Sequence, residues 1–139
     1  MNMKLKKIIF LFSLIAVFIS CNSKTAEEYV FEGIKKSKHN DLKGALEMFD
    51  KAIKMKTDYA EAYKQRGCIK FNMRDTEGSL ADLSEAIKCN NEYAEAYFNR
   101  GNVYVFLKDM TKACKDFRKA KELNYPYIDE SLRMCKFYN

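Results

Sequence analysis

The chain has 139 residues, of which 47% are hydrophobic and 32% charged, and its formal net charge is +6. This composition suffices for one packed domain, and a single proline with five glycines favours long helices over a sheet with many turns. Three of the positive charges, Lys4, Lys6 and Lys7, lie in the first twenty residues, so the remainder is only mildly basic and has no dense Lys/Arg run. The composition therefore argues against a nucleic-acid-binding protein.

Residues 1–20 have the layout of an export signal. A short basic stretch is followed by apolar residues from Ile8 to Ile19, with Ser13 as the only polar member. A bilayer-spanning helix needs about 20 apolar residues, so this run is too short for a comfortable anchor and suits a secretory signal.

The end of this segment, Ser20-Cys21, resembles the bacterial lipoprotein signal, in which a small residue precedes a cysteine that becomes lipidated. The resemblance implies a signal peptide at 1–20 and a lipidated linker at 21–25, so that the exported protein is held at the cell envelope by its acyl chains. Asn22 is not the aspartate that retains many lipoproteins at the inner membrane, which favours the outer membrane. A plain cleaved signal and an uncleaved membrane helix are the alternatives.

After this segment the sequence repeats with a period of 34 residues. Glycines, tyrosines and alanines recur in step: Gly33, Gly67 and Gly101; Tyr29, Tyr63 and Tyr97; Ala52, Ala86 and Ala120. The period divides the chain into units 26–59, 60–93 and 94–127, and a shorter piece, 128–139, begins another first helix. Such a period indicates a stacked helical solenoid, because each unit needs its neighbours to bury its apolar face.

Each unit reads as a helix, a short turn and a second helix. In the first unit, Thr25-x-x-Glu28 predicts a capping box at the start of the first helix. Asp58 and Asn91 are the expected N-caps in the second and third units. Turns between the paired helices are expected at 39–41, near 74–75 and near 108–109.

The repeat resembles the tetratricopeptide repeat, a helix–turn–helix family with an aromatic residue, a small residue four positions later, and Ala, Phe and Ala in the second helix. The second-helix residues that match are Ala45, Phe49 and Ala52; Ser79, Leu83 and Ala86; and Ala113, Phe117 and Ala120. The family's proline at the repeat end is missing or displaced. The resemblance implies an all-α protein, an α-solenoid of three units with a C-terminal capping helix at 128–139, whose first helices line a concave face.

Comparison between the units predicts two ion pairs. The second and third units have an arginine before the glycine and an aspartate sixteen residues later, whereas the first unit has Glu32 and Met48 at these positions. Because both partners are gained or lost together, and antiparallel helices bring the positions close, we expect contact. The predicted pairs are Arg66–Asp82 and Arg100–Asp116; two independent surface charges are the alternative.

Four cysteines remain after Cys21, and an exported protein can oxidise them. Cys114 and Cys135 lie about equally far from the turn at Pro126, so they should be level on neighbouring antiparallel helices, and we expect a disulfide between them. Cys68 and Cys89 should be out of register and stay free. Four buried thiols are the alternative.

No motif in the sequence indicates catalysis or a cofactor. There is no phosphate-binding glycine loop, no H-E-x-x-H and no nucleophile elbow, and the single histidine, His39, falls in a turn. Acids recur where each first helix begins: Glu27, Glu61, Glu95 and Asp129. They complement the positive end of the helix dipole, and a cation site is the less favoured interpretation. We therefore expect no enzyme activity, no cofactor, no metal site and no small-molecule substrate.

The concave face is then the candidate binding surface, for a protein or peptide partner. The matching positions combine aromatic anchors, amides and a few cations: Phe31, Ile34, Lys64, Gln65, Phe71, Phe98, Asn99, Asn102, Phe106 and Arg133. Some co-chaperone relatives hold a peptide's terminal carboxylate with a Lys/Asn/Arg clamp, and Val30, Ile34 and Glu95 replace three of its residues here. Lys64, Asn99 and Arg133 would form a partial clamp one unit along.

Taken together, the sequence predicts a non-catalytic adaptor or assembly factor that binds a protein partner at the bacterial cell envelope. A structural subunit that uses its convex face or self-association is the alternative, and a large exposed apolar patch away from the groove would favour it. An enzyme or small-ligand carrier would instead need a closed pocket with converging polar groups.

Overall fold

The computed structural model describes residues 23–138, so the predicted signal peptide and the lipidation site Cys21 lie outside the described residues. The described chain consists of helices and the turns and short connections that join them. Its elements are α2 (Ala26–Lys38), α3 (Leu42–Met55), α4 (Ala60–Asn72), α5 (Thr76–Cys89), α6 (Ala94–Phe106), α7 (Met110–Glu122), α8 (Asp129–Met134) and the 3₁₀ helix η1 (Cys135–Phe137). None of the helices in this part of the chain combines the length and apolar character that a bilayer crossing requires.

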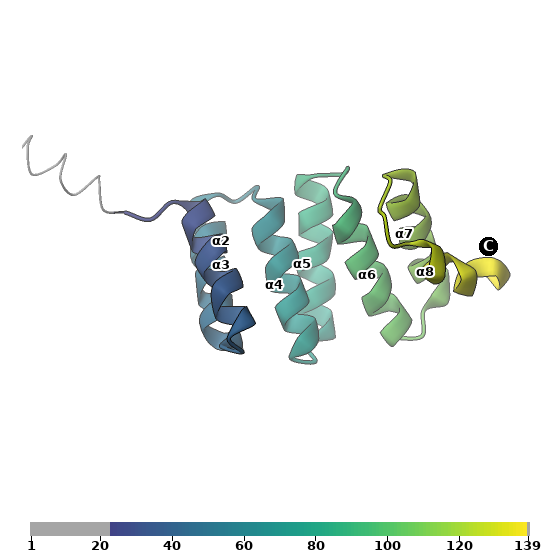
Figure 1. Ribbon diagram of the computed structural model, residues 1–139, viewed down its shortest axis with the longest axis horizontal. Coiled ribbons are helices and arrows are strands. Elements are labelled where there is room, and N and C mark those ends of the chain that lie inside the picture. The colour runs from purple at the N-terminus through teal and green to yellow at the C-terminus, as the bar shows by residue number, and fades with distance from the viewer. Residues whose placement is uncertain (1–22, 139) are drawn as a thin grey trace, which may run out of the picture.

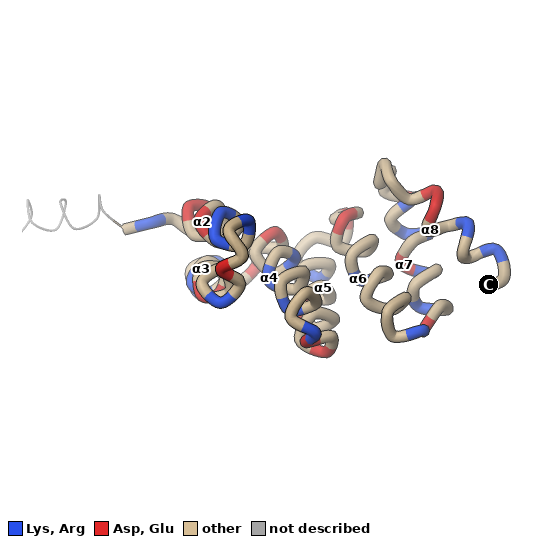
Figure 2. The backbone as a smooth tube through the Cα atoms, turned by 60° about the horizontal axis from the view of Figure 1, so that its bottom comes forward, with Lys and Arg blue, Asp and Glu red and all other residues tan. Residues whose placement is uncertain are grey.

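The helices form three antiparallel hairpins, α2–α3, α4–α5 and α6–α7, that stack side by side along the long axis of the molecule (Figure 1). Each hairpin packs against the next through its helices, and lysines, arginines and acids are interspersed along the stack (Figure 2). The predicted all-α solenoid of three two-helix units is confirmed in the described residues.

Close contacts between the helices of each hairpin explain the repeated glycines. A Cβ atom on Gly33 would lie 2.6 Å from Cε1 of Phe49, and one on Gly101 would lie 2.5 Å from Cε1 of Phe117. Either contact is too short for a real side chain, so glycine lets the phenylalanine ring lie against the helix backbone. The alanines at the other repeat positions are completely buried.

The turns within the hairpins lie where the sequence predicts them. Asn40, Arg74 and Lys108 have φ angles of 61°, 68° and 61°, in the left-handed region that reverses the chain sharply. An aspartate follows each turn and caps the next helix: Asp41, Asp75 and Asp109 accept hydrogen bonds from the backbone N–H groups of Gly44, Gly78 and Lys112.

The helix starts are predicted correctly once and wrongly twice. Thr25 and Glu28 form the expected capping box at α2. Asp58 and Asn91, however, are not N-caps: Tyr59 and Tyr93 take that position, without a side-chain cap. Tyr59 packs against the first core cluster, and the hydroxyl of Tyr93 donates to Glu61, so tertiary contacts of the tyrosines prevail over capping preference. The buried residues of this cluster are Ala26, Val30, Ala45, Phe49, Ala52, Ala62 and Ile69.

The C-terminal segment is helical over a shorter range than the predicted 128–139. Helix α8 ends at Met134, and Cys135 begins the single 3₁₀ turn that follows, so Cys135 does not lie midway along a terminal helix. Without a side-chain N-cap, six residues form little independent helix. The segment is held instead by the buried Ile128 side chain and by the disulfide at Cys135.

Candidate partner-binding groove

The first helices of the hairpins bring several of the predicted binding residues together between α4 and α6. A pocket of about 250 Å³ opens there, with residues of α5 contributing to its lining. The residues that line it are Cys68, Phe71, Asn72, Ser79, Leu83, Asn99, Asn102 and Val103. Of the ten residues predicted from sequence, Phe71, Asn99 and Asn102 lie at this pocket.

The pocket carries polar groups that the fold does not use. The side-chain amides of Asn72, Asn99 and Asn102 make no hydrogen bond to any other residue within 23–138. The hydroxyl of Ser79 is completely buried and likewise lacks a partner in this part of the chain. A buried hydroxyl without a hydrogen bond costs about 1–3 kcal/mol, so such groups are expected to serve a purpose.

An aromatic ledge continues from the pocket. Phe71 meets Phe106 edge-on, with ring centroids 5.5 Å apart, and Phe106 remains 47% exposed. The guanidinium of Arg74 lies 5.3 Å from the centroid of the Phe106 ring. Rings that are fixed by neighbours and still reach solvent suit an anchoring role at an interface.

Lys64 differs from the expected groove residue, because it is only 4% exposed. Its ammonium lies 3.2 Å from carboxylate oxygens of both Glu61 and Glu95, and 5.7 Å from the ring centroid of Tyr93. The side chain therefore joins the second repeat to the third and is not free to bind a partner. Repeat spacing gives no signal of this, since it does not show which charges lie opposite each other across two repeats.

Phe98 also belongs to the packed interior more than to the groove surface. Its ring stacks on Tyr125 at a centroid distance of 4.5 Å and lies 5.9 Å from the ring of Phe117. Tyr125 precedes the predicted capping segment, so this stack supports the C-terminal end of the solenoid.

Glu61 is the centre of the polar contacts around Lys64. It accepts hydrogen bonds from Tyr93 and, at 2.6 Å, from the amide of Gln65. Burial alone would raise the pKa of Glu61, but these hydrogen bonds and the Lys64 ammonium outweigh it and lower the pKa. Burial and the bond to Glu61 raise the pKa of the Tyr93 hydroxyl.

The partial clamp is not assembled. Lys64 is held by two carboxylates, and Arg133 is exposed on α8, where its guanidinium lies 2.8 Å from Glu130. Asn99 lies at the pocket, whereas the exposed Arg133 lies on another element and pairs with Glu130 there.

The remaining predicted residues lie apart from the pocket. Phe31, 72% exposed, borders a second hollow of about 600 Å³ on α2, where Lys24–Glu32 and Lys36–Asp41 form ion pairs. Ile34 packs against the first core cluster.

The structure brings together the residues of both predicted ion pairs. Arg66 donates from Nε and Nη2 to Asp82 at 2.8 and 2.6 Å, and Arg100 donates from the same atoms to Asp116 at 2.8 Å each. Both aspartates are nearly buried. Each pair joins the two helices of its own hairpin, α4–α5 or α6–α7, and neither pair lines the pocket.

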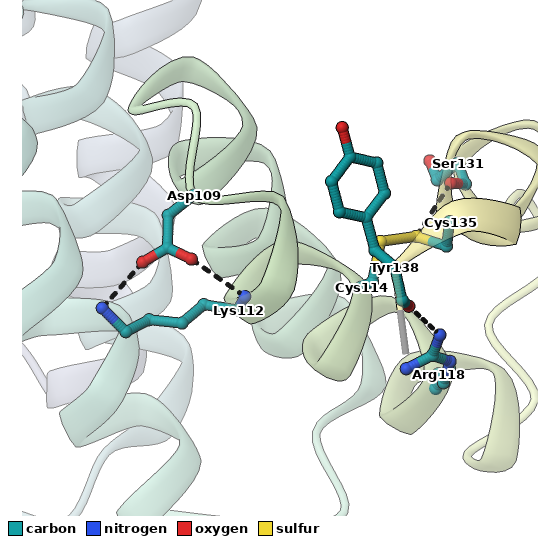
Figure 3. Close-up of a disulfide and its surroundings, with 7 residues drawn as sticks. All are labelled: Asp109, Lys112, Cys114, Arg118, Ser131, Cys135 and Tyr138. Carbon is teal, nitrogen blue, oxygen red and sulfur yellow. Dashed lines mark hydrogen bonds and ion pairs between the residues drawn. A yellow bond between two sulfur atoms is a disulfide. The ribbon is translucent and has the colours of Figure 1, made fainter.

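A disulfide joins Cys114 of α7 to Cys135, with Cα atoms 5.5 Å apart (Figure 3). Arg118 donates to the backbone carbonyl of Tyr138 beside it, which adds a second link between α7 and the C-terminal segment. Cys68 and Cys89 are free. Burial raises the pKa of the Cys68 thiol to about 11, so this thiol is largely protonated at neutral pH.

Among the described residues, no three His, Cys, Asp or Glu side chains lie close enough together to hold a metal ion. Three of the recurring acids at the first-helix starts are paired with lysines, and Glu27 is at the 4.0 Å limit of an ion pair with Lys56.

Cys68, Asn72, Ser79, Leu83 and Val103 were missed as groove residues. The sequence does carry a signal for two of them: Ser79 and Leu83 stand where the other repeats have alanine and phenylalanine.

Comparisons with known proteins agree with this architecture. Residues 94–127 match a family model described as "Tetratricopeptide repeat", and residues 75–106 match one described as "TPR repeat". These segments therefore carry tetratricopeptide repeats, as the sequence predicts. No curated protein matches the chain.

Several solved structures share the fold. The first TPR of Spaghetti (RPAP3), bound to the HSP90 peptide SRMEEVD, is 23% identical, with a TM-score of 0.75 over 81% of this chain and 91% of the other. The second TPR of the same protein, bound to the same peptide, is 22% identical, with a TM-score of 0.69 over 73% and 94%. The Arabidopsis OM64 TPR domain is 20% identical, with a TM-score of 0.75 over 79% and 93%. The predicted tetratricopeptide α-solenoid is thus confirmed as the fold.

Proposed function

We propose that this protein is a non-catalytic adaptor or assembly factor that binds a segment of a protein partner between α4 and α6. In this proposal, the lipidated Cys21 holds the chain at the bacterial cell envelope, with the outer membrane favoured. The three hairpins act as a rigid support for the groove, and the linker at 21–25 joins the support to the lipid.

The unused polar groups beside an exposed aromatic ledge carry the proposal. The side-chain amides of Asn72, Asn99 and Asn102 reach solvent and form no hydrogen bond within the described residues, so they are available to a ligand. Phe106 supplies apolar area next to them. The peptide bound to each of the two RPAP3 domains supports the view that this fold offers such a groove.

The chemistry of this groove differs from capture of a terminal carboxylate. Lys64 is neutralised by Glu61 and Glu95, and Arg133 is paired on another element. No cationic side chain lines the pocket within the described residues. We therefore expect an internal segment of a partner, not an acidic C-terminus.

Crosslinking pull-down from membranes tests the groove. Asn102→Arg places a long charged side chain in the pocket, and Glu47→Arg makes a comparable change at an exposed site of α3, outside the pocket. The proposal expects partners to be lost with Asn102→Arg and retained with Glu47→Arg. Equal recovery of every partner with both variants would remove the groove from the account.

The anchor has a separate test. Cys21→Ser in the full chain should abolish labelling by a radioactive fatty acid and release the protein from the membrane fraction, since the cysteine thiol carries the lipid in this type of signal. Cys89→Ser, a change at a free cysteine of the described chain, is the control. Membrane retention of Cys21→Ser without a label would favour an uncleaved membrane helix.

One observation supports the alternative of a structural subunit. The C-terminal end exposes Tyr127 by 79%, Met134 by 44% and Phe137 by 90%, an apolar group away from the pocket. If Phe137→Asp abolishes partner recovery or self-association in sedimentation, and Asn102→Arg does not, this end is the functional surface instead.

A further inference from the structure

Two residues that line the pocket between α4 and α6 depart from the pattern of the neighbouring repeats. In the first and third repeats, the rings of Phe49 and Phe117 fill the space against Gly33 and Gly101. The middle repeat has the shorter Leu83 at this position, and its Cγ lies 3.0 Å from a Cβ atom placed on Gly67. A leucine in place of a ring leaves room beyond its methyl groups, and Leu83 lines the pocket.

The second departure is chemical. Alanine stands at positions 45 and 113, but serine stands at position 79, where its hydroxyl is buried and unpartnered in the described chain. Alanine would fit here without that cost, as it does in the two other repeats. The smaller side chain of Leu83 and the added hydroxyl of Ser79 therefore line the same pocket. Together they point to a ligand group in this pocket, because neither improves the packing of the hairpin.

The residues that line the pocket disfavour a charged ligand group. Within the described residues, no Lys, Arg, Asp or Glu lines it. A carboxylate or an ammonium that entered would lose hydration without contacting an opposite charge among the lining residues. A neutral polar group avoids that cost, provided that it can both donate and accept hydrogen bonds.

A carboxamide meets this requirement best, because it carries two N–H donors and a carbonyl acceptor. Its carbonyl can accept from an asparagine N–H, and its amino group can donate to the asparagine carbonyls. The completely buried Ser79 hydroxyl can donate to the same carbonyl when the side chains that cover it shift. Phe71, Leu83 and Val103 provide apolar surface for the methylene stem.

We propose that this pocket recognises the side chain of an asparagine or glutamine in the partner segment. The inference deepens the proposed function and rests on it, since the segment would lie across α4 and α6. It assigns the second repeat, through Leu83 and Ser79, as the source of selectivity.

Cys68 allows the pocket to be tested directly, because its thiol lines the pocket and is free. The protein is brought to exchange equilibrium with small disulfides of matched length whose tips are a carboxamide, a carboxylate, an ammonium or a methyl group. Intact mass and peptide mapping then give the conjugate at Cys68 and verify that Cys114–Cys135 stays oxidised. Cys89, the other free thiol, is the internal reference.

We expect the carboxamide conjugate at Cys68 to exceed the methyl conjugate by about fivefold, the ratio that one net neutral hydrogen bond of about 1 kcal/mol provides. The two charged tips should fall below the methyl tip. Cys89 should show no preference among the four. Equal conjugation of carboxamide and methyl tips at Cys68, or the same preference at Cys89, would overturn the inference.

Two variants sharpen the result. Ser79→Ala should reduce the carboxamide preference and leave the unfolding midpoint no lower, because alanine occupies the matching positions of the other repeats. Leu83→Phe should exclude all four tips, and its circular dichroism melt verifies folding. An unchanged preference in Ser79→Ala would remove the hydroxyl from the inference.

The result is separable from the proposed function. If Cys68 shows no preference but Asn102→Arg still abolishes partner capture, the groove binds its partner without this specificity and the inference alone fails. If Asn102→Arg leaves capture intact while Cys68 prefers the carboxamide, the pocket stands and the proposed use of the groove fails.

Discussion

Asp116 and Asp82 are the buried acids of the molecule's described part, and each depends on one arginine sixteen residues earlier in the chain. The sequence allows this contact to be predicted, because the first repeat lacks both partners and has the buried Met48 at the matching position. It does not reveal that Arg66 also binds Asp50, or that Lys70 binds Asp82. Those contacts have no counterpart of the same kind in the third repeat, where Arg100 bonds to Ser84 instead.

Asp116→Ala should lower the free energy of unfolding by about 3 kcal/mol, since it leaves the guanidinium of Arg100 partly buried without its carboxylate. Urea denaturation followed by circular dichroism measures the change. The double change Arg100→Met with Asp116→Met should recover much of the loss, because no unpaired charge remains. Glu130→Gln, which breaks an exposed pair, is the control and should cost under about 1 kcal/mol.

Lys108→Asn should stabilise the protein by up to about 1 kcal/mol. Lys108 has a φ angle of 61°, a conformation that asparagine tolerates better than lysine, and Asn40 and Asn124 occupy turns with the same angle. The urea midpoint should rise. Lys115→Asn, within α7, should lower the midpoint because asparagine is a poorer helix former. A lower midpoint for Lys108→Asn would mean that the lysine side chain stabilises the turn.

At the scale of elements, the period of 34 residues places each helix, because glycine and alanine mark where two helices approach. The exact starts of α4 and α6 could not be predicted, since they depend on where Tyr59 and Tyr93 pack. The length of α8 likewise depends on contacts with α7 and not on local preference. Lys64 is predicted for the groove because first helices line the concave face in the resembled family. Its burial cannot be predicted from the repeat, since the acids that bury it come from the starts of two different helices, α4 and α6.

The contact between α4 and α6 should make stability depend on pH through Glu61. Its pKa in the folded protein is lowered by its hydrogen bonds and by Lys64, against the effect of burial. The stabilisation is therefore complete above the unfolded value of about 4.3 and is lost as pH falls through the lower folded pKa. The urea midpoint of the parent should fall more between pH 7 and pH 3 than that of Glu61→Gln.

The control for this prediction is Glu47→Gln, which removes an exposed acid of α3 that forms no ion pair in the described chain. Its urea midpoint should follow the parent over the same pH interval. If Glu61→Gln and the parent lose the same stability, the network around Lys64 does not contribute to the acid sensitivity of the fold.

At the scale of the whole molecule, the stack of hairpins means that each repeat contacts only its neighbours. The sequence predicts this arrangement and the concave face, but it does not show which crevice between first helices stays open. A phenylalanine ring lies against the glycine in two repeats, whereas the shorter Leu83, which lines the pocket, stands at that position in the middle one. Leu83 therefore contributes both to the space in the pocket and to the packing of the central hairpin against Gly67.

This arrangement predicts that truncating a buried side chain in the central hairpin destabilises more helices than truncating one in the first hairpin. In a linear stack, stability is a sum of repeat and interface terms, and the central hairpin has two interfaces whereas the first has one. Phe49→Ala should remove about 3–5 kcal/mol from the first hairpin and raise hydrogen exchange mainly in α2 and α3. Leu83→Ala should raise exchange in all three hairpins, because it uncouples both neighbours. Hydrogen exchange with mass spectrometry distinguishes these patterns by segment. Equal acceleration in α7 for both variants would show that the three hairpins unfold as one unit.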